Sequence, residues 1–396
     1  MKCFGCCLLA AAGLCIGQLS SLPPLVREGG VWAHVVLGAF PCAVRGQLKV
    51  STTGDVVLRG VSRDDCGYRI RQKTYAATEA VARQQLRGFA SRAKAIVDTS
   101  ILTLVPAEGS DATLELELWI PRTMREATLM TKSGRVVATD FDGSVAVDSG
   151  GGPIDLDRIG GNGTAQTVGG KIKIGSVTGS VRCFSGGGYI RVDHAGGETW
   201  VDTAGGEISI GQVMGALHVT TAGGNISIDR AAGAVWARSM SGLIDIQEAG
   251  GAVTAVARGG SIQIGSAKSG ANCEANSGTI RVKSQDGPVQ LSTLMGNILA
   301  QLTSGRSFAD SSVNSDSGDV TVLIPHDFPV SVLATNETPG YRGMIVSEFP
   351  QIRVVKRGGM SPVKAEGLLN GGGPVLRVST GRGSIYLLRQ KDGASR

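Results

Sequence analysis

Three ring side chains recur at a spacing of 18 residues: Trp200, His218 and Trp236. Arg182 precedes Trp200 by the same spacing, and Phe184 follows two residues after Arg182. Large side chains that gather on a surface usually mark a contact site, and flat aromatic faces suit sugar rings or the side chains of a partner protein. If 18 residues is the repeat of the fold, these five residues form one ligand-binding strip. The alternatives are that a cap loop covers the strip, or that tryptophan stands there because it favours β-strands.

A second possible chemistry is polysaccharide cleavage by carboxylates. Asp155, Asp157 and Asp193 could serve a lyase-like site of the kind found in pectin-degrading β-helices, where several carboxylates and a base converge in a cleft. Asp157 and Asp193 are two 18-residue repeats apart, and Gly175 lies midway between them. The sequence therefore predicts no catalytic residues and a protein that is not an enzyme, and a polysaccharide-active enzyme is the least favoured alternative.

No set of residues suggests a metal, a cofactor or nucleic acid. The four histidines are scattered, at His34, His194, His218 and His326. The calcium-binding nonapeptide needs Gly-Gly-x-Gly-x-Asp, whereas Gly160–Gly163 is followed by Thr164 and Ala165. No Gly-Lys-Ser/Thr phosphate loop is present. The net charge of +6 on 396 residues, without a dense basic run, is too dilute to argue for nucleic acid.

The element that positions the ring side chains is marked by glycine at every ninth residue. The marker runs from Gly134 to Gly260 without interruption, slips at Ser269, and resumes from Gly278 to Gly305. After each marker, apolar residues stand at the second and fourth positions, as in Gly206, Ile208 and Ile210. Such alternation indicates a short strand with one buried face. The glycines should end turns, where a positive φ or a close backbone approach is needed.

The nine-residue units alternate between two kinds, so the full repeat is an 18-residue coil. Units that begin at marker glycines such as Gly170, Gly206, Gly224, Gly242 and Gly260 carry Ile-x-Ile, and the intervening units carry smaller pairs. We therefore predict an all-β fold, a β-solenoid in which each coil has two nine-residue half-repeats, one bulky wall and one small wall. Neighbouring coils should lie ~4.8 Å apart.

This register also assigns the cysteines of the repeats. Cys183 and Cys273 both occupy an inward position, five coils apart. Five coils correspond to roughly 24 Å, whereas a disulfide needs Cα atoms within about 7 Å. These two cysteines should therefore be buried and unpaired. Cys42 and Cys66 could pair if both remain after processing.

The chain divides into four predicted segments. Residues 1–45 are expected to be a signal peptide, a longer export leader or an anchor, because residues 3–16 and 31–44 are apolar; cleavage is expected between Gly17 and Gly46. Residues 46–133 should form a small α/β cap with strands at 46–61, 96–105 and 112–120 and a helix from Thr78 to about Ala93. Residues 134–313 should hold the coils, and residues 314–396 a β-rich cap that ends in a solenoid strand at 383–387.

The repeat resembles a known bacterial family. The unit Thr221-Ala222-Gly223-Gly224-Asn225-Ile226-Ser227-Ile228, the segment Ser317-Gly318-Asp319-Val320 and the closing Leu369-Asn370-Gly371-Gly372-Gly373-Pro374 are similar to the DUF4097 group of β-strand-repeat proteins, described as adhesins. The resemblance covers roughly residues 46–390. It implies a solenoid fold and an adhesin-like protein of the cell envelope, and it supplies no catalytic residues.

The sequence therefore favours an exported binding or scaffold protein that is periplasmic, on the cell surface or secreted. A glycan or a protein would be its ligand, and a membrane would be reached only through an N-terminal anchor. The first alternative is a membrane-anchored structural or envelope-stress protein in which the solenoid is only a spacer.

Overall fold

The computed structural model describes residues 25–87, 90–96, 98–105, 112–284, 286–303, 307–337, 344–355 and 362–390. These residues form two compact units, one that ends at Thr167 and one that begins at Val168. Each unit contains two sheets, called A and B below. Apart from one short helix in the first unit, the elements of the described residues are β-strands, as the sequence predicts.

The first unit contains one helix and the strands β1 to β13. In chain order they are β1 (Val26–Glu28), β2 (Val31–Phe40), β3 (Gln47–Thr52), β4 (Asp55–Val61), β5 (Cys66–Thr74), α1 (Glu79–Arg87), β6 (Ala90–Ile96), β7 (Thr99–Val105), β8 (Thr113–Pro121), β9 (Glu126–Thr131), β10 (Val136–Phe141), β11 (Ser144–Ser149), β12 (Ile154–Ile159) and β13 (Gly163–Thr167).

The second unit begins with regularly spaced strands that alternate between the sheets, even-numbered strands in sheet A and odd-numbered strands in sheet B. They are β14 (Ile172–Val177), β15 (Val181–Ser185), β16 (Ile190–Ala195), β17 (Thr199–Thr203), β18 (Ile208–Val213), β19 (Leu217–Thr221), β20 (Ile226–Ala231), β21 (Val235–Ser239), β22 (Ile244–Ala249), β23 (Val253–Ala257), β24 (Ile262–Ala267), β25 (Ala271–Ser277), β26 (Ile280–Ser284), β27 (Val289–Met295) and β28 (Ile298–Leu302).

The C-terminal part of the second unit is less regular. It consists of β29 (Ser311–Ser317), β30 (Val320–Ile324), β31 (Val330–Asn336), β32 (Ile345–Ser347), β33 (Arg353–Val355), β34 (Val363–Leu369), β35 (Val375–Arg382) and β36 (Ile385–Arg389).

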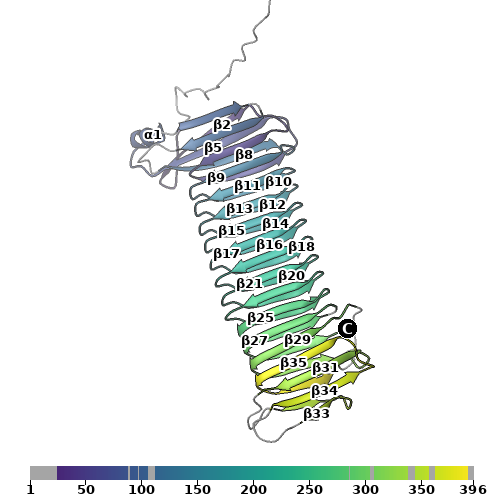
Figure 1. Ribbon diagram of the computed structural model, residues 1–396. Helices are drawn as coiled ribbons and strands as arrows, with labels where there is room; N and C mark the ends of the chain where they lie inside the picture. Colours follow the sequence, from purple (N-terminus) through teal and green to yellow (C-terminus); the bar gives the residue numbers. More distant parts are fainter. Residues whose placement is uncertain are drawn as a thin grey trace, which may run out of the picture. The chain divides into compact units, whose positions relative to one another are not determined.

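Strand pairing follows the 18-residue repeat. In sheet A, Ile208 of β18 pairs in parallel with Ile190 of β16 and with Ile226 of β20. In sheet B, β19 pairs in the same way with β17 and β21, and Figure 1 shows these strands stacked in succession. The predicted β-solenoid with two nine-residue half-repeats per coil is confirmed.

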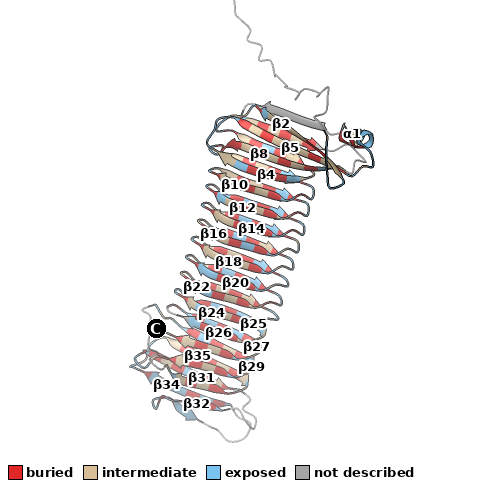
Figure 2. Cartoon of the chain, turned by 180° about the vertical axis from the view of Figure 1, so that it is seen from behind, coloured by how far each residue is buried: buried red, intermediate tan, exposed pale blue. Residues whose placement is uncertain are grey.

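The interior is narrow and divided between a bulky wall and a small wall. Ile208, Ile226 and Ile244 of sheet A are fully buried, and they share the interior with sheet B residues such as Ala237 and Ala255. Buried and more exposed residues alternate along the strands, as Figure 2 shows. Cys183 and Cys273 are both buried and unpaired, as predicted.

The marker glycines of sheet A allow two backbones to approach closely. A Cβ atom added to Gly224 would lie 2.1 Å from the carbonyl oxygen of Gly206, and one added to Gly242 would lie 2.0 Å from that of Gly224. Neither glycine has a positive φ. Of the two reasons that the sequence offered for glycine, close approach is therefore the one that applies at these positions.

A buried hydroxyl accompanies each of these glycine contacts. The Thr221 hydroxyl donates to the carbonyl of Gly206 (3.0 Å) and accepts a hydrogen bond from the backbone N–H of Gly224 (3.2 Å). Ser239 makes the same two contacts one coil further on, with Gly224 and Gly242. The hydroxyl thus links successive coils at the corner and satisfies two backbone groups. This explains the recurrent Thr/Ser-x-x-Gly of the sequence.

The coils of the second unit do not follow chain order at its C-terminal end. β35 pairs in parallel with both β29 and β31, and β36 with both β30 and β32. The last coil in the sequence therefore lies between two earlier ones (Figure 1). Antiparallel strands β34 and β33 then complete sheet B. The strand expected at 383–387 is present as β36.

Parallel pairing of the coils continues beyond residue 313, where the sequence predicts the end of the repeats. The pairing distance rises from 18 to 22 residues where Gln290 meets Ser312, because the connection between β28 and β29 is longer. The nine-residue period fails there, although the coils continue. Gly318 continues the stack of marker glycines in sheet A: a Cβ atom added to it would lie 2.1 Å from the carbonyl oxygen of Gly296. Gly305 lies outside the described residues.

The first unit repeats this arrangement at the other end of the sequence. β4 pairs in parallel with β8 and β10, and β3 with β7 and β9. The coil of β3 and β4 therefore lies between two coils that come later in the chain. The segment 46–133, predicted as a cap, contains complete coils in addition to the antiparallel strands β5 and β6 and helix α1.

The apolar segment 31–44 belongs largely to this unit. Val31–Phe40 forms β2, which pairs antiparallel with β5 from Trp32 to Phe40. Cys42 and Cys66 form a disulfide, with Cα atoms 6.0 Å apart. The leader or anchor predicted for residues 1–45 stays a prediction, since the apolar run 31–44 suits strand β2 as well as a leader. Residues 1–24 lie outside the described part of the chain.

The predicted helix is shorter than expected. Helix α1 covers Glu79–Arg87, and the Thr78 hydroxyl accepts from the Val81 N–H at 3.4 Å, as expected of an N-cap. Residues 90–93, predicted to end the helix, instead belong to β6, which runs antiparallel to β7. Pairing with an open strand edge outweighs the local helical pattern there. Phe89 lies outside the described residues.

A buried histidine makes the first unit sensitive to pH. His34 of β2 is 3% exposed, and its Nδ1 has no hydrogen-bond partner in the described part of the chain. Burial, and to a smaller extent the charge of Arg83 on α1, lower the pKa of His34 below its usual 6.5. The unfolded chain therefore binds a proton that the folded unit does not bind.

We expect the first unit to lose stability as the pH falls below about 6.5, by at most about 1.4 kcal/mol per pH unit from this group. Hydrogen exchange in β2 and α1 between pH 7.5 and 5.5 measures the effect, after correction for the intrinsic exchange rate. The variant His34→Gln should show a shallower dependence. Equal dependences in the two proteins would contradict the assignment to His34.

Candidate functional site

Trp200, His218 and Trp236 form a stacked ladder on the outer surface of sheet B. Trp200 of β17 pairs in register with His218 of β19, and His218 pairs with Trp236 of β21. The ring centroids of Trp200 and His218 lie 3.8 Å apart, and those of His218 and Trp236 lie 4.4 Å apart. The ring planes are parallel within 5° and 2° respectively. The column expected from the 18-residue spacing is present.

The stacking changes what the ladder presents to solvent. Trp200 and Trp236 are 40% and 42% exposed, and the His218 side chain is 25% exposed. Both faces of His218 and one face of each indole are covered by the neighbouring ring. The surface therefore presents ring edges, and a flat ligand can stack only on the outer face of Trp200 or of Trp236. The sequence did not anticipate this, because spacing fixes the column but not the ring rotamers.

The two other predicted site residues flank the ladder. Arg182 of β15 precedes Trp200 in the same column, and Phe184 pairs in register with Asp202 in the neighbouring column. Phe184 is 49% exposed. Glu198 adds a carboxylate 3.8 Å from Nε2 of His218. The site thus combines an aromatic ridge with polar side chains on both sides. It contains no nucleophile paired with a base.

The carboxylates considered for catalysis are each bound to an arginine. In the first unit, Asp155 lies 3.6 Å from Arg135, and Asp157 contacts Arg158. In the second unit, Asp193 accepts from Arg191 at 2.6 Å. Each of these three aspartates therefore forms an ion pair with an arginine on the solvent-exposed surface.

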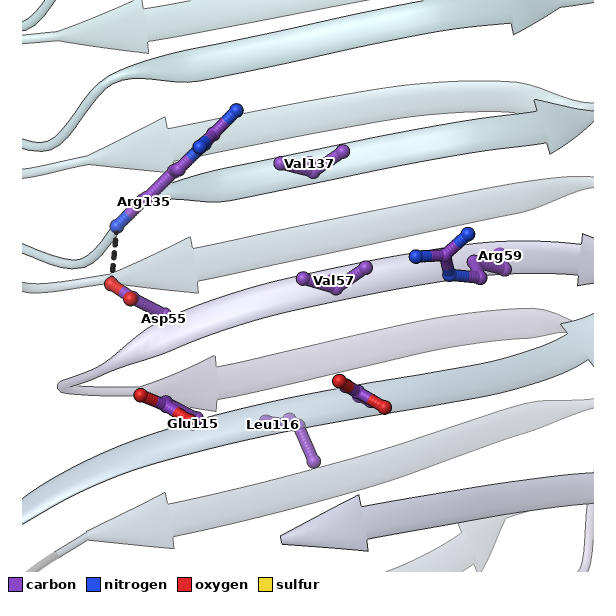
Figure 3. Close-up of a pocket in the computed structure, with 8 residues that line it drawn as sticks. Asp55, Val57, Arg59, Glu115, Leu116, Arg135 and Val137 are labelled. Carbon is purple, nitrogen blue, oxygen red and sulfur yellow. Dashed lines mark hydrogen bonds between the residues drawn. The ribbon is translucent and has the colours of Figure 1, made fainter. Parts of the chain in front are cut away.

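A shallow pocket on the first unit was not predicted. It has a volume of about 380 Å³, and it is lined by side chains of β4, β8 and β10. Figure 3 shows Val57 and Val137 between charged residues, with the Arg135 N–H donating to Asp55 Oδ1 at 2.8 Å. Glu115 pairs with Lys73, and Glu117 lies 3.7 Å from Arg69. Glu115 and Glu117 are therefore engaged in cross-strand ion pairs, whereas Asp55 accepts a backbone hydrogen bond.

The described residues show neither a cluster of metal ligands nor a membrane-spanning helix. No group of three or more histidine, cysteine, aspartate or glutamate side chains there is arranged to hold a metal ion. None of the helices in that part of the chain has the length and apolar character to span a membrane.

Comparison with known proteins gives only distant structural likenesses. No family model matches the sequence, and no curated protein matches it. A proposed cell adhesion protein from Clostridium sporogenes ATCC 15579 is 8% identical over 90% of this chain and 100% of its own, with a TM-score of 0.22.

A proposed adhesin from Parabacteroides merdae ATCC 43184 is 10% identical over 74% of this chain and 96% of its own, with a TM-score of 0.28. A proposed lipid-binding protein from Parabacteroides distasonis ATCC 8503 is 12% identical over 75% of this chain and 98% of its own, with a TM-score of 0.24. At such identities and TM-scores, these likenesses carry no argument about the ligand.

Proposed function

We propose that this protein is an exported, non-enzymatic binding scaffold of the bacterial envelope, adhesin-like, that contacts a glycan or protein ligand through the sheet B surface around Trp200, His218 and Trp236. The observation that carries the proposal is the exposed ladder itself. Three ring side chains in successive coils leave two indoles about two-fifths exposed. A soluble protein that keeps such residues in water gains most from them when a ligand covers them.

Membership of the DUF4097 group is part of this proposal. It is supported by the repeat unit Thr221–Ile228 and by the closing Leu369–Pro374 segment. Export is supported by the basic start and apolar stretch of residues 2–16. The disulfide between Cys42 and Cys66 also suits an oxidising compartment. Cleavage before Val26 would leave β1, β2 and this disulfide in the mature protein.

Ligand binding should be lost when the ladder is removed. On an array of glycans and envelope proteins, we expect the variant Trp200→Ala/Trp236→Ala to bind its ligand about five- to 150-fold more weakly than the native protein, because two lost stacking contacts of about 0.5–1.5 kcal/mol each sum to about 1–3 kcal/mol. The matched control is Lys173→Ala/Arg191→Ala, which removes two outward side chains of neighbouring sheet A strands. Circular dichroism checks that each variant is folded.

The same experiment addresses the alternative of a membrane-anchored spacer. A spacer needs the coils but not the ladder, so equal binding or equal absence of binding by native protein and double variant would favour it. Release of sugar from an acidic polysaccharide, abolished by Asp155→Ala or Asp157→Ala, would instead indicate an enzyme.

A further inference from the structure

The two outer faces of the ladder, one on Trp200 and one on Trp236, border different side chains. Beyond Trp236, the column continues with Thr254 of β23 and then Asn272 of β25. Beyond Trp200, it continues with Arg182 of β15. Threonine is small and arginine is long. The free face of Trp236 is therefore bordered by a small side chain, and that of Trp200 by a long one.

We propose that the small side chain of Thr254 leaves a notch that holds one hexopyranose ring, stacked on the free face of Trp236. The proposal rests on the proposed function, that the ladder binds a ligand, and it names the position and the class of that ligand. The sugar ring would be the next rung of the ladder, in the place that a fourth aromatic side chain would occupy.

The spacing of the coils suits one flat ring. Trp236 and Asn272 are two coils apart, ~9.6 Å by the strand spacing. A ring in van der Waals contact on both sides needs roughly 7–8 Å, twice the optimal carbon–carbon separation. His218 fills the equivalent space between Trp200 and Trp236, with ring centroids 3.8 Å and 4.4 Å from its neighbours. The fold therefore already accommodates a ring at this spacing.

The rim of the notch favours a sugar over an aromatic side chain. It includes the Thr254 hydroxyl, the Asn272 amide and the Arg238 guanidinium, which lies beside Trp236 in the neighbouring column. Within the described residues, none of these three side chains has a hydrogen-bond or ion-pair partner. A pyranose offers an apolar face for the indole and hydroxyls at its edge for the rim. An aromatic side chain would leave the rim groups without partners.

Filling the notch tests the proposal. In the variant Thr254→Trp, an outward tryptophan occupies the place of the ligand ring and removes no ladder residue. The matched control is Gln263→Trp, which places the same side chain outward on β24 of sheet A. The probes are the methyl glycosides of glucose, galactose and mannose, together with N-acetyltryptophanamide, and binding is followed by saturation-transfer NMR and titration.

We expect at least one glycoside to bind the native protein, and both Thr254→Trp and Trp236→Ala to weaken it by about tenfold or more. Gln263→Trp should bind within about threefold of the native protein. Binding of the tryptophan amide but of no glycoside would overturn the sugar assignment. If Trp200→Ala loses binding and Thr254→Trp keeps it, the ligand lies at the other end of the ladder, and the proposed notch is wrong.

The failure of the notch is distinguishable from the failure of the proposed function. If the double variant Trp200→Ala/Trp236→Ala loses binding while Thr254→Trp retains it, the ladder binds the ligand elsewhere and only the notch is wrong. If the double variant binds as the native protein does, both proposals are wrong.

Discussion

Replacing Gly224 by alanine should destabilise the second unit by about 3 kcal/mol or more. The added Cβ would lie 2.1 Å from the Gly206 oxygen and 2.6 Å from the Glu207 nitrogen. Both contacts are to backbone, so neither can be relieved by a change of side-chain rotamer. The two coils would have to separate at this corner, which also weakens the hydrogen bonds between the Thr221 hydroxyl and the two glycines.

The neighbouring Gly223 provides the control for this prediction. A Cβ at Gly223 would meet no atom closer than 3.4 Å, an ordinary contact. Gly223→Ala should therefore be neutral or stabilise by up to about 1 kcal/mol, because alanine restricts the unfolded chain. The unfolding midpoints of both variants in urea measure the difference. If Gly224→Ala proved as stable as Gly223→Ala, the stacked-corner account of the glycine period would be wrong.

Removal of residues 374–396 should disrupt the C-terminal end of the second unit beyond the residues removed. The deletion takes out β35 and β36, whose Leu376, Val378, Ile385 and Leu387 are almost fully buried. Each such side chain contributes about 1.5–3 kcal/mol through burial. Because this coil lies between β29–β30 and β31–β32, its loss leaves the strands of residues 330–369 without a parallel partner.

Hydrogen exchange followed by mass spectrometry checks this prediction. Residues 330–369 should lose their protection in the shortened chain, while strands β16 to β22 keep theirs. A chain that ends at Gln390 keeps both strands and serves as the control. If protection of residues 330–369 persisted in the shortened chain, the inserted position of the last coil would be contradicted.

The regular part of the fold could be predicted because its information is local. An 18-residue repeat fixes which side chain lies above which. It thereby gave the inward positions of Cys183 and Cys273 and the outward column of Trp200, His218 and Trp236. The bulky and small walls followed from the same alternation.

The ends of the chain could not be predicted in this way, because their pairing is non-local. Nothing in residues 47–61 indicates that they lie between two coils formed later in the sequence. The apolar run 31–44 suits a leader as well as strand β2. Residues 90–93, predicted to end the helix, instead pair with β7. In each case a partner strand far along the chain decides the structure.

The candidate site was predicted in its position but not in its geometry. The spacing placed Trp200 and Trp236 in one column with His218 between them. It did not show that the rings stack face to face, which leaves edges and two terminal faces for a ligand. That difference moves the expected contact from the whole strip to one end of the ladder.

Whether a ligand touches the ladder can be measured directly by tryptophan fluorescence. The chain has four tryptophans, so the variant Trp32→Phe/Trp119→Phe keeps only Trp200 and Trp236 as emitters. We predict that a ligand identified on the array shifts or quenches this emission with the same affinity that calorimetry measures. Binding in the calorimeter with unchanged emission would contradict the claim that the ladder is the binding surface.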